Sequence, residues 1–550
     1  MMTTTMLNRS STRLLRGRSA QPKPQRATTA RRGVADARRP SMAPKPIIDI
    51  KHIRQNAELY ERTCEERRYR RLAGHPSRIV ALHKRWQELQ RQGRSLRERS
   101  NLLRKLMANP ATSSGDEELG EVRQMTRAQV QEEARRLKAE LAGIERGEAE
   151  AVAEMETLAL ELPNLTSDET PRGDEPVVLG YINQPPPPDD GPDAARDHDA
   201  NNERQEGADA DVKPWRSHVQ IGTELGILDF AAAAASSGWG WYYLVGEAAQ
   251  LEQALVQYAL GAAAARGWTP VSPPSMVYSH IGAACGFRPR DQHGEQQVYA
   301  VARARADAER GVPELCLAGT SEIALAGMAA NATLDAADLP LRRVAVSRCY
   351  RAEAGARGAD AKGLFRVHEF TKVELFAWTA PDAARARALF DDMLALQADI
   401  LAALGLRCRL LSMPAADLGA SAARKVDIEA YFPSRRRLLP ASRGWGEVTS
   451  ASLCTDYQAR RLATRTRLTS GALAFPYSAN ATALAVPRVL AALLESGWDE
   501  ASGTVAVPAC LRPWMGGRDR IRGTRRPLRE GRQAVCMNGR GTIGAGEEGS

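Results

Sequence analysis

The sequence predicts an α+β protein with a mostly antiparallel sheet and flanking helices, preceded by an antiparallel helical hairpin. Two apolar repeats with alternating steps of three and four residues, separated by a helix breaker, predict the hairpin. Strand-like stretches interspersed with helical ones, without a βαβ rhythm, predict the sheet. A chain of 550 residues has room for roughly three to five domain-sized blocks.

The composition excludes several classes of protein. With 43% hydrophobic and 26% charged residues, the chain is not disordered throughout. No stretch of about 18 uncharged apolar residues predicts a membrane span. Eight cysteines without a CxxC pair predict free thiols in a reducing compartment and no zinc ribbon. The net charge of +10 suits a polyanionic partner.

Residues 1–45 are expected to form an organellar transit peptide. Asp36 is their only acidic residue, and arginines are spaced among Ser, Thr and Ala. A secretory signal would need an apolar core, which is missing here. The early, abundant arginines favour the mitochondrial matrix, while a plastid stays open. The alternative is a disordered basic tail that binds nucleic acid without specificity.

Residues 46–165 are expected to form the arm domain. The first apolar repeat runs from Ile79 to Met107 and ends at the breaker Asn109-Pro110. The second runs from Val130 to Leu162 and stops at Pro163. Two helices of ~30 residues give an arm about 45 Å long.

The first helix of this arm carries far more basic than acidic side chains. A basic excess on one helix is typical of a surface that contacts a phosphate backbone. The alternative is a solvated face that only keeps the protein soluble. The candidate residues for binding a nucleic-acid backbone are Arg85, Arg91, Arg94 and Arg97.

Composition also marks a linker and a tail. Residues 183–212 combine a run of four prolines with many acidic residues, which cannot build a core and predict an extended insertion. Residues 215–517 form the predicted catalytic body. Residues 518–550 are rich in Arg and Gly and are expected to be a disordered basic tail.

The body contains no phosphate-binding glycine loop, neither GxxxxGK[ST] nor GxGxxG after a strand. A nucleotide would therefore be bound by side chains. Strands are predicted at Leu341–Cys349, Glu369–Trp378 and Gly471–Phe475, and a helix at Ala383–Leu404.

Two predicted strands joined by a glycine-containing loop carry the first candidate site residues. Arg351 and Glu353 precede the loop, and Val367 to Phe370 and Glu374 follow it. Arginine suits bidentate contact with phosphate, and Phe370 offers a face for a base. The alternative is an ordinary surface hairpin.

Two further segments add oxygen donors and a cation. Glu447 and Ser450 offer the hard oxygens that Mg²⁺ prefers, although a helix-capping pair is the alternative. Asn480 to Arg488 predicts a strand that runs into a helix, with Pro487 in the first turn. Arg488 would then lie near a helix N-terminus, where phosphate is favoured.

In this order behind a basic arm, the segments resemble one family, seryl-tRNA synthetase of the organellar type, a class II aminoacyl-tRNA synthetase. The resemblance covers about Ile47 to Gly517. Four runs resemble class II motifs 1, 2 and 3 and the serine-binding loop, and a fifth is specific to the family. In chain order these runs are Gly267–Pro274, Gly319–Glu322, Arg351–Glu374, Asp456–Leu462 and Asn480–Arg488.

The resemblance implies a homodimer with no membrane contact that activates L-serine with ATP and transfers it to tRNA(Ser) in organellar translation. It implies Arg351 and Arg488 as the catalytic residues, Mg²⁺ at Glu447 and Ser450, and no zinc. The implied ATP-binding residues are Arg351, Glu353, Val367, Phe370, Glu447, Ser450 and Arg488. The implied serine-binding residues are Thr320, Glu322, Arg351, Glu374 and Thr482.

Three rival functions remain. A catalytically inactive paralogue that binds RNA would be expected to have lost phosphate ligands, yet Arg351, Glu447 and Arg488 are present. An enzyme that aminoacylates a carrier protein would lack the arm. A threonyl-type synthetase would need a zinc site, for which the sequence offers no Cys/His constellation.

Overall fold

The computed structural model describes residues 43–108, 125–183, 216–288, 296–353, 363–439 and 442–523. The expected transit peptide, apart from its last three residues, lies outside the described residues. The same is true of the acidic linker after residue 183 and of the tail after residue 523. Among the described residues, no helix combines the length and apolarity that crossing a bilayer requires.

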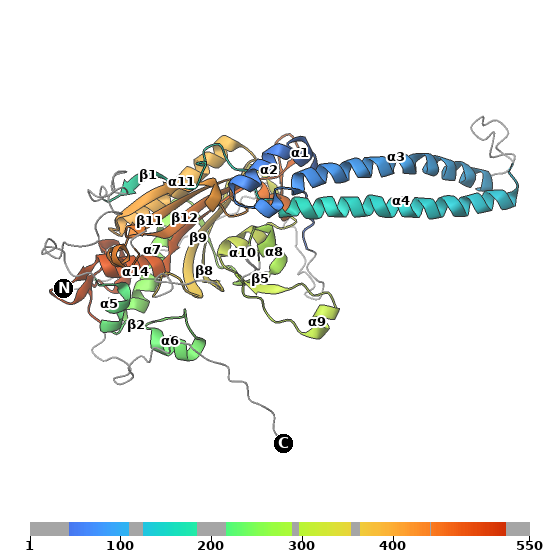
Figure 1. Cartoon of the computed structure of the whole chain (residues 1–550). Helices are drawn as coiled ribbons and strands as arrows, with labels where there is room; N and C mark the ends of the chain where they lie inside the picture. Colours follow the sequence, from blue (N-terminus) through green and yellow to red (C-terminus); the bar gives the residue numbers. More distant parts are fainter. Residues whose placement is uncertain are drawn as a thin grey trace, which may run out of the picture. The chain divides into compact units, whose positions relative to one another are not determined.

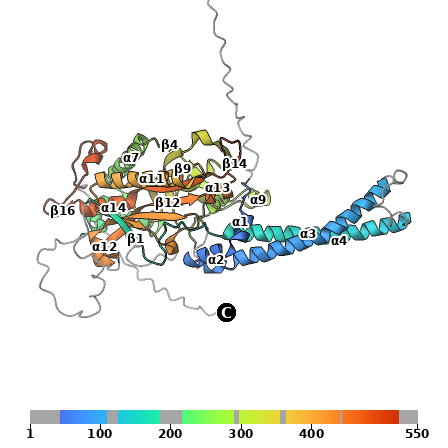
Figure 2. The same cartoon turned by 90° about the horizontal axis from the view of Figure 1, so that it is seen from above.

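The predicted hairpin is present as two long helices. Helix α3 runs from His75 to Ala108 and α4 from Arg127 to Glu161, and the two lie side by side (Figures 1 and 2). At 1.5 Å per residue, each helix is about 50 Å long. Thr126 and Gln129 form a capping box that begins α4, and Pro163 follows its end. The repeats predicted to meet are buried between the helices, including Ile79, Leu82, Leu103, Val130, Leu137 and Met155.

The base of the arm contains α1 (Ile50–Gln55), α2 (Ala57–Glu66) and a short 3-10 turn at Arg70–Leu72. Arg67 is buried there, and its guanidinium donates to the backbone oxygens of Asn164 and Gly419. Asn164 Nδ2 donates in turn to the oxygens of Ser421 and Cys454 at 2.9 and 2.8 Å. The arm base is thus hydrogen-bonded to the catalytic body.

The described part of the body is built on an eight-stranded sheet in the order β1-β10-β11-β12-β15-β9-β8-β4. Every neighbouring pair is antiparallel except β4 and β8, which are parallel. The mostly antiparallel prediction is confirmed. In chain order the strands are β1 (Val177–Ile182), β4 (Thr269–Val271), β8 (Leu341–Tyr350), β9 (Glu369–Thr379), β10 (Cys408–Ser412), β11 (Arg424–Tyr431), β12 (Trp445–Thr455) and β15 (Tyr477–Ala485).

Three helices cover one face of the sheet and form the main core with it: α7 (Glu247–Ala265), α11 (Ala383–Ala403) and α14 (Val486–Ser496). Strand β9 contributes side chains to both faces of the sheet. Val373 and Leu375 belong to this core, whereas their neighbours on the opposite face line a cavity. Successive side chains of a strand point to opposite faces, so one short sequence supplies both.

The remaining described elements are shorter. Among them, α10 packs on β8 and β9, and α8 packs on α10 and β5, around a second apolar cluster. The bounds of the remaining helices are α5 (His218–Glu224), α6 (Phe230–Ser237), α8 (Ser279–Ala284), α9 (Arg305–Glu309), α10 (Ser321–Gly327), α12 (Pro433–Leu438) and α13 (Tyr457–Arg461). The short strands are β2 (Leu228–Asp229), β3 (Tyr243–Leu244), β5 (Met276–Tyr278), β6 (Leu315–Leu317) and β16 (Trp498–Asp499).

Two predictions differ from the structure. The strand predicted at Gly471–Phe475 is only β14 (Leu473–Ala474), which joins β13 (Arg465–Arg467) and β7 (Thr333–Asp335) in a separate small sheet. The tail was expected to be disordered from residue 518, which is wrong for its first residues. There β18 (Arg520–Ile521) pairs with β17 (Thr504–Ala506), and Ile521 is buried.

Candidate active site

A cavity of about 310 Å³ lies on the face of the sheet opposite α7, α11 and α14. Its lining includes Arg351, which directly follows β8, side chains of β9, β11, β12 and β15, and the first residues of α10 and α14. Every residue predicted to contact serine, ATP or the metal lies in this lining: Thr320, Glu322, Arg351, Glu353, Val367, Phe370, Glu374, Glu447, Ser450, Thr482 and Arg488. Segments up to 168 residues apart in the chain are therefore brought to one place.

Strand β9 contributes three side chains by simple alternation. Phe370, Lys372 and Glu374 are two residues apart, so all three point to the cavity. The sequence analysis missed Lys372. Lys372 lies two residues from both Phe370 and Glu374, so the alternation of side chains along a strand was a sufficient signal to find it.

A β-bulge explains how β12 contributes both predicted metal ligands. Residues three apart on a regular strand point to opposite faces, so Glu447 and Ser450 could not share a site. Ile428 of β11 pairs with Thr449 and Glu429 pairs with Glu447, which leaves Val448 as the extra residue. The bulge brings both oxygen donors to the cavity. The alternative interpretation as a helix-capping pair is wrong, because both residues lie within a strand.

Strand β15 contains a second bulge, in the segment that resembles motif 3. Thr482 pairs with Glu374 and Leu484 pairs with Val373, so Ala483 is the extra residue. Ala483 is fully buried in the main core. The predicted transition from strand to helix is confirmed, since α14 begins at Val486, directly after β15.

One half of the cavity is acidic and buried. Thr320 caps α10, and its hydroxyl accepts from the Glu322 backbone N–H at 3.2 Å. Burial and, to a smaller extent, the nearby charge of Glu374 raise the pKa of Glu322 to about 8, although Lys372 and the hydrogen bond from Gln458 act in the opposite direction. Lys372 Nζ lies 2.6 Å from Glu374 Oε2, and the Thr482 hydroxyl donates to that oxygen at 3.1 Å.

The other half of the cavity is basic. Arg488 donates from Nε to Phe365 O and from Nη1 to Glu447 O, both at 3.1 Å, and Nη1 lies 3.3 Å from Glu447 Oε2. Burial by itself would raise the pKa of Glu447, but Arg488, Lys425 and Arg351 outweigh it and lower that pKa to about 2. Glu447 is therefore ionised at neutral pH, while its side chain stays 41% exposed to a ligand.

The two remaining predicted contacts flank Arg351. Its Cζ atom lies 5.3 Å from the centre of the Phe370 ring, within the range of a cation–π contact. Glu353 Oε2 is 3.3 Å from Arg366 Nη1, so this carboxylate is paired with a cation on the other side of the loop. The middle of that loop lies outside the described residues.

Buried residues outside the cavity hold the returning end of this loop. His218 Nε2 accepts from the Leu364 backbone N–H at 3.1 Å, and His218 Nδ1 lies 2.8 Å from Glu495 Oε1. The following residue, Phe365, packs beneath Arg488, whose Cζ lies 4.6 Å from the ring centre. A Cβ on Gly446 would lie 2.8 Å from that ring, so the glycine makes space for it.

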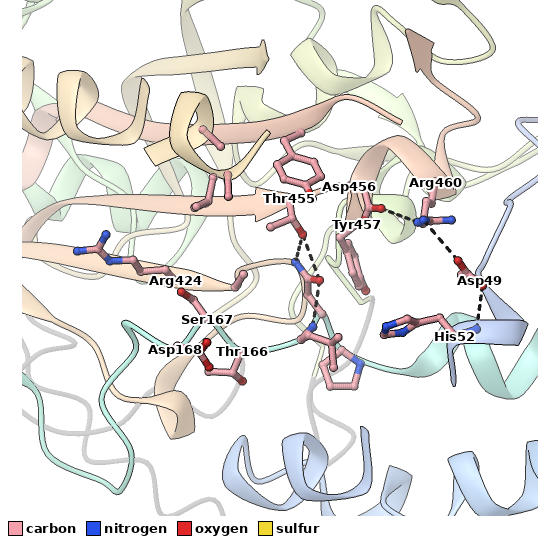
Figure 3. A pocket seen from close by; sticks show the side chains of 18 of the residues that line it. Asp49, His52, Thr166, Ser167, Asp168, Arg424, Thr455, Asp456, Tyr457 and Arg460 are labelled. Carbon is pink, nitrogen blue, oxygen red and sulfur yellow. Dashed lines mark hydrogen bonds and ion pairs between the residues drawn. The ribbon is translucent and has the colours of Figure 1, made fainter. Parts of the chain in front are cut away.

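A larger cavity of about 880 Å³ lies between the arm base and the body, but it contains none of the predicted site residues (Figure 3). Its charged groups largely satisfy one another. Arg387 and Arg424 both pair with Glu169, and Arg460 pairs with Asp456 and Asp49. We therefore assign the chemistry to the smaller cavity.

The four arginines predicted to contact tRNA do not form one surface. Nine residues separate Arg85 from Arg94, which at about 100° per residue places them on opposite sides of α3. Arg91 and Arg94 are highly exposed and pair with Glu88 and Glu98 of their own helix. Arg97 is 34% exposed and lies 2.7 Å from Glu148 of α4, so its charge joins the two helices.

The cavity combines two kinds of recognition. Two carboxylates and a threonine hydroxyl suit a small molecule that carries an ammonium and a hydroxyl group. Two arginines beside an ionised carboxylate suit a polyphosphate with its divalent cation. A reaction between these two ligands would rest on their relative position and on charge stabilisation.

Two family models match the chain. A family model described as the tRNA synthetase class II core domain (G, H, P, S and T) matches residues 302–497. The model of the seryl-tRNA synthetase N-terminal domain matches residues 47–166.

Individual relatives include mitochondrial and bacterial proteins. The chain is 43% identical over 305 residues to the mitochondrial serine–tRNA ligase of Saccharomyces cerevisiae, which covers 55% of this chain and 64% of that protein. It is 35% identical over 472 residues to the mitochondrial serine–tRNA ligase of Schizosaccharomyces pombe, covering 85% and 88%. It is also 35% identical to the serine–tRNA ligase of Rubrobacter xylanophilus, covering 86% of this chain and 98% of that protein.

Solved structures show the same architecture. Seryl-tRNA synthetase from Pyrococcus horikoshii, complexed with ATP, superimposes with a TM-score of 0.71 at 29% identity, covering 86% of this chain and 99% of that one. The cytoplasmic serine–tRNA ligase from Naegleria fowleri has a TM-score of 0.68 at 23% identity, a likeness of fold alone.

Proposed function

The chain belongs to the seryl-tRNA synthetase family, and on this premise we propose that it activates L-serine with ATP and transfers it to the 3′ end of tRNA(Ser) in mitochondrial translation. The observation that carries the proposal is the single cavity that holds an acidic, hydroxyl-bearing half and a basic half. Serine would occupy the first half and the phosphates of ATP the second.

The first step needs little proton transfer. A carboxylate oxygen of serine attacks the α-phosphorus of ATP, the bond to the bridging oxygen breaks, and pyrophosphate leaves with that electron pair. Arg351 would hold the α-phosphate and the serine carboxylate, while Arg488 would hold the γ-phosphate. Both would stabilise the charge that develops in the transition state.

Recognition of serine would depend on the acidic half. Glu322 would bind the ammonium group, and Glu374 with Thr482 would bind the hydroxyl. Alanine would leave these buried groups without a partner, which is a strong basis for discrimination. Glu353 and Val367 would position the adenine, and Phe370 would stack on it.

Mg²⁺ fits the basic half. Glu447 is ionised at neutral pH, and Ser450 supplies a neutral oxygen on the same side of β12. These two residues would hold the cation that enters with ATP, and the cation would neutralise negative charge on the phosphates.

In the second step, a ribose hydroxyl at the 3′ end of tRNA(Ser) attacks the seryl carbonyl and AMP leaves. The arm would contact the long variable arm of this tRNA through Arg91 and Arg94, with Arg85 on another side of α3. The mitochondrial relatives support a mitochondrial location. A homodimer would use the segment at Gly267–Pro274, which contains β4 at the edge of the sheet.

The rival function, an inactive paralogue that binds RNA, predicts a damaged cavity. The arrangement of both halves favours the enzyme instead. Purified protein supplied with labelled serine, ATP, Mg²⁺ and tRNA(Ser) should form seryl-tRNA. A tRNA(Ser) without its variable arm is the matched control and should be charged poorly. Tight tRNA binding without charging of either tRNA would establish the rival.

A further inference from the structure

Helix α13 does not line the cavity, yet one of its side chains reaches a residue that does. Gln458 Nε2 donates to Glu322 Oε1 at 2.7 Å. Both side chains are buried, with Gln458 1% and Glu322 6% exposed. Gln458 belongs to the Asp456–Leu462 run, which the sequence analysis singled out without assigning it any chemistry.

The orientation of the Gln458 amide satisfies both of its buried partners. The Ser478 hydroxyl donates to Gln458 Oε1 at 2.7 Å. An ionised carboxylate can only accept, so the amide nitrogen faces Glu322 in the state that binds an ammonium group, and the Ser478 hydroxyl meets the amide oxygen. Gln458 therefore presents a donor, and only a donor, to the carboxylate.

A second amide acts on the same oxygen. Asn480 Nδ2 donates to Glu322 Oε1 at 2.9 Å. Both donors thus converge on Oε1, and the other carboxylate oxygen, Oε2, remains outside this network. The carboxylate is held by one oxygen and can offer the second to a ligand in the cavity.

The arm base holds α13 on its other side. Arg461 is buried, and its Nη2 donates to the backbone oxygens of Leu160 and Leu162 at 3.2 and 3.1 Å. Arg460 bonds to Asp456 at 2.7 Å and pairs with Asp49 of the arm base (Figure 3). The short helix is thereby anchored at both sides, so Gln458 has a well-defined position.

We propose that Gln458 is a positioning residue for serine recognition, which holds Glu322 so that its second oxygen meets the ammonium group. The proposal rests on the proposed function, because it concerns the amino-acid half of that site. Without the amide, Glu322 would be drawn towards Lys372, the cation that already binds Glu374. The ammonium position would then lose its carboxylate oxygen.

The test is the substitution Gln458→Met, which keeps the volume and removes both polar atoms. Pyrophosphate exchange should show a serine KM raised about 10- to 100-fold, as for one hydrogen bond to a charged group, with the ATP KM unchanged. The control is Arg460→Lys, on the same helix, which keeps the positive charge that pairs with Asp456 and Asp49 and should leave both KM values unchanged. An equal rise in both KM values for Gln458→Met would overturn the proposal, because it would assign Gln458 to the folding of α13.

A double-mutant cycle supplies the sharper readout. Glu322→Gln should itself raise the serine KM, and adding Gln458→Met to it should change that KM by less than about twofold, since the shared interaction is already lost. Fully additive effects would overturn the proposal.

If Gln458→Met does not fold, Ser478→Ala tests the same point, because it removes the donor to the Gln458 amide oxygen and leaves that side chain less firmly held. It should raise the serine KM about threefold or more, as expected for a weakened hydrogen bond. An unchanged serine KM would overturn the proposal. A wild-type protein without serine-dependent exchange would instead reject the proposed function itself.

Discussion

Thr482 and Glu374 are direct partners across strands β15 and β9, and the Thr482 hydroxyl donates to Glu374 Oε2 at 3.1 Å. Lys372 Nζ contacts the same oxygen at 2.6 Å and the Thr482 hydroxyl oxygen at 3.4 Å. All three side chains are buried. A hydroxyl and an ammonium group thus hold the carboxylate to which we assign recognition of the serine hydroxyl.

Thr482→Val tests this arrangement directly. Valine keeps the shape of threonine but cannot donate to Glu374, so the buried carboxylate loses a partner. We expect the serine KM to rise roughly 5- to 30-fold, equivalent to about 1–2 kcal/mol. Thr482→Ser keeps the hydroxyl and is the matched control, with a change below about threefold. Equal serine KM values for valine and wild type would contradict the assignment.

Arg488→Lys tests the basic half. Lysine keeps the positive charge but cannot bond to Phe365 O and Glu447 O while it also meets a phosphate. We expect the KM for ATP to rise about tenfold or more, with the serine KM little changed. Steady-state pyrophosphate exchange at varied concentrations of ATP and of serine measures both KM values. A selective effect on serine would mean that the two halves have been assigned the wrong way round.

The raised pKa of Glu322 predicts a pH dependence for serine binding. The ammonium group of serine favours the ionised carboxylate, so binding below about pH 8 should release a proton. The serine KM should therefore fall as the pH rises towards 8 and level off above it, by at most about tenfold per pH unit. Calorimetry in buffers of different ionisation enthalpy measures the released proton. Glu322→Gln should abolish the release.

The same shift has a consequence for stability. The folded protein binds this proton more tightly than the unfolded chain, whose glutamate has a pKa of 4.5. The contribution of Glu322 to folding is therefore complete below about pH 4.5 and is lost as the pH rises through about 8. The free energy of unfolding of Glu322→Gln should depend less on pH across this window than that of wild type.

The exposed arginines of the arm lead to a prediction about tRNA binding, which should depend on salt concentration, and not about serine activation. Replacing both Arg91 and Arg94 by Gln should weaken tRNA(Ser) binding and reduce the slope of log K against log salt by roughly one per lost phosphate contact. Serine-dependent pyrophosphate exchange without tRNA should be unchanged. Replacing Arg135 and Arg136 of α4, which are also exposed, is the matched control. An equal loss in both double variants would show that only total charge matters.

Some features of the fold could be predicted from the sequence because they depend on residues that are close together in the chain. The long helix α3, the strands that begin at Leu341 and Glu369, and the strand that runs into α14 could all be predicted from short-range patterns. The assignment of roles to residues depended on the resemblance to a known family, and it stays a prediction.

Other features depended on contacts between distant segments. The bulges at Val448 and Ala483 can be seen only once each strand has a partner, because the extra residue is defined by the register. The approach of Gln458 to Glu322 spans 136 residues of sequence. Arg97 was predicted to contact tRNA. In the structure it forms an ion pair with Glu148, which lies on the other helix of the hairpin.

The central claim is that the cavity lined by Arg351, Glu322 and Arg488 is where serine is adenylated. Pyrophosphate exchange with purified protein, Mg²⁺-ATP and each of serine, threonine and alanine tests it most directly, with Arg351→Ala in parallel. We expect exchange that depends on serine, is far weaker with threonine and alanine, and is lost in Arg351→Ala. Exchange that persists in Arg351→Ala, or its absence with all three amino acids, would contradict the claim.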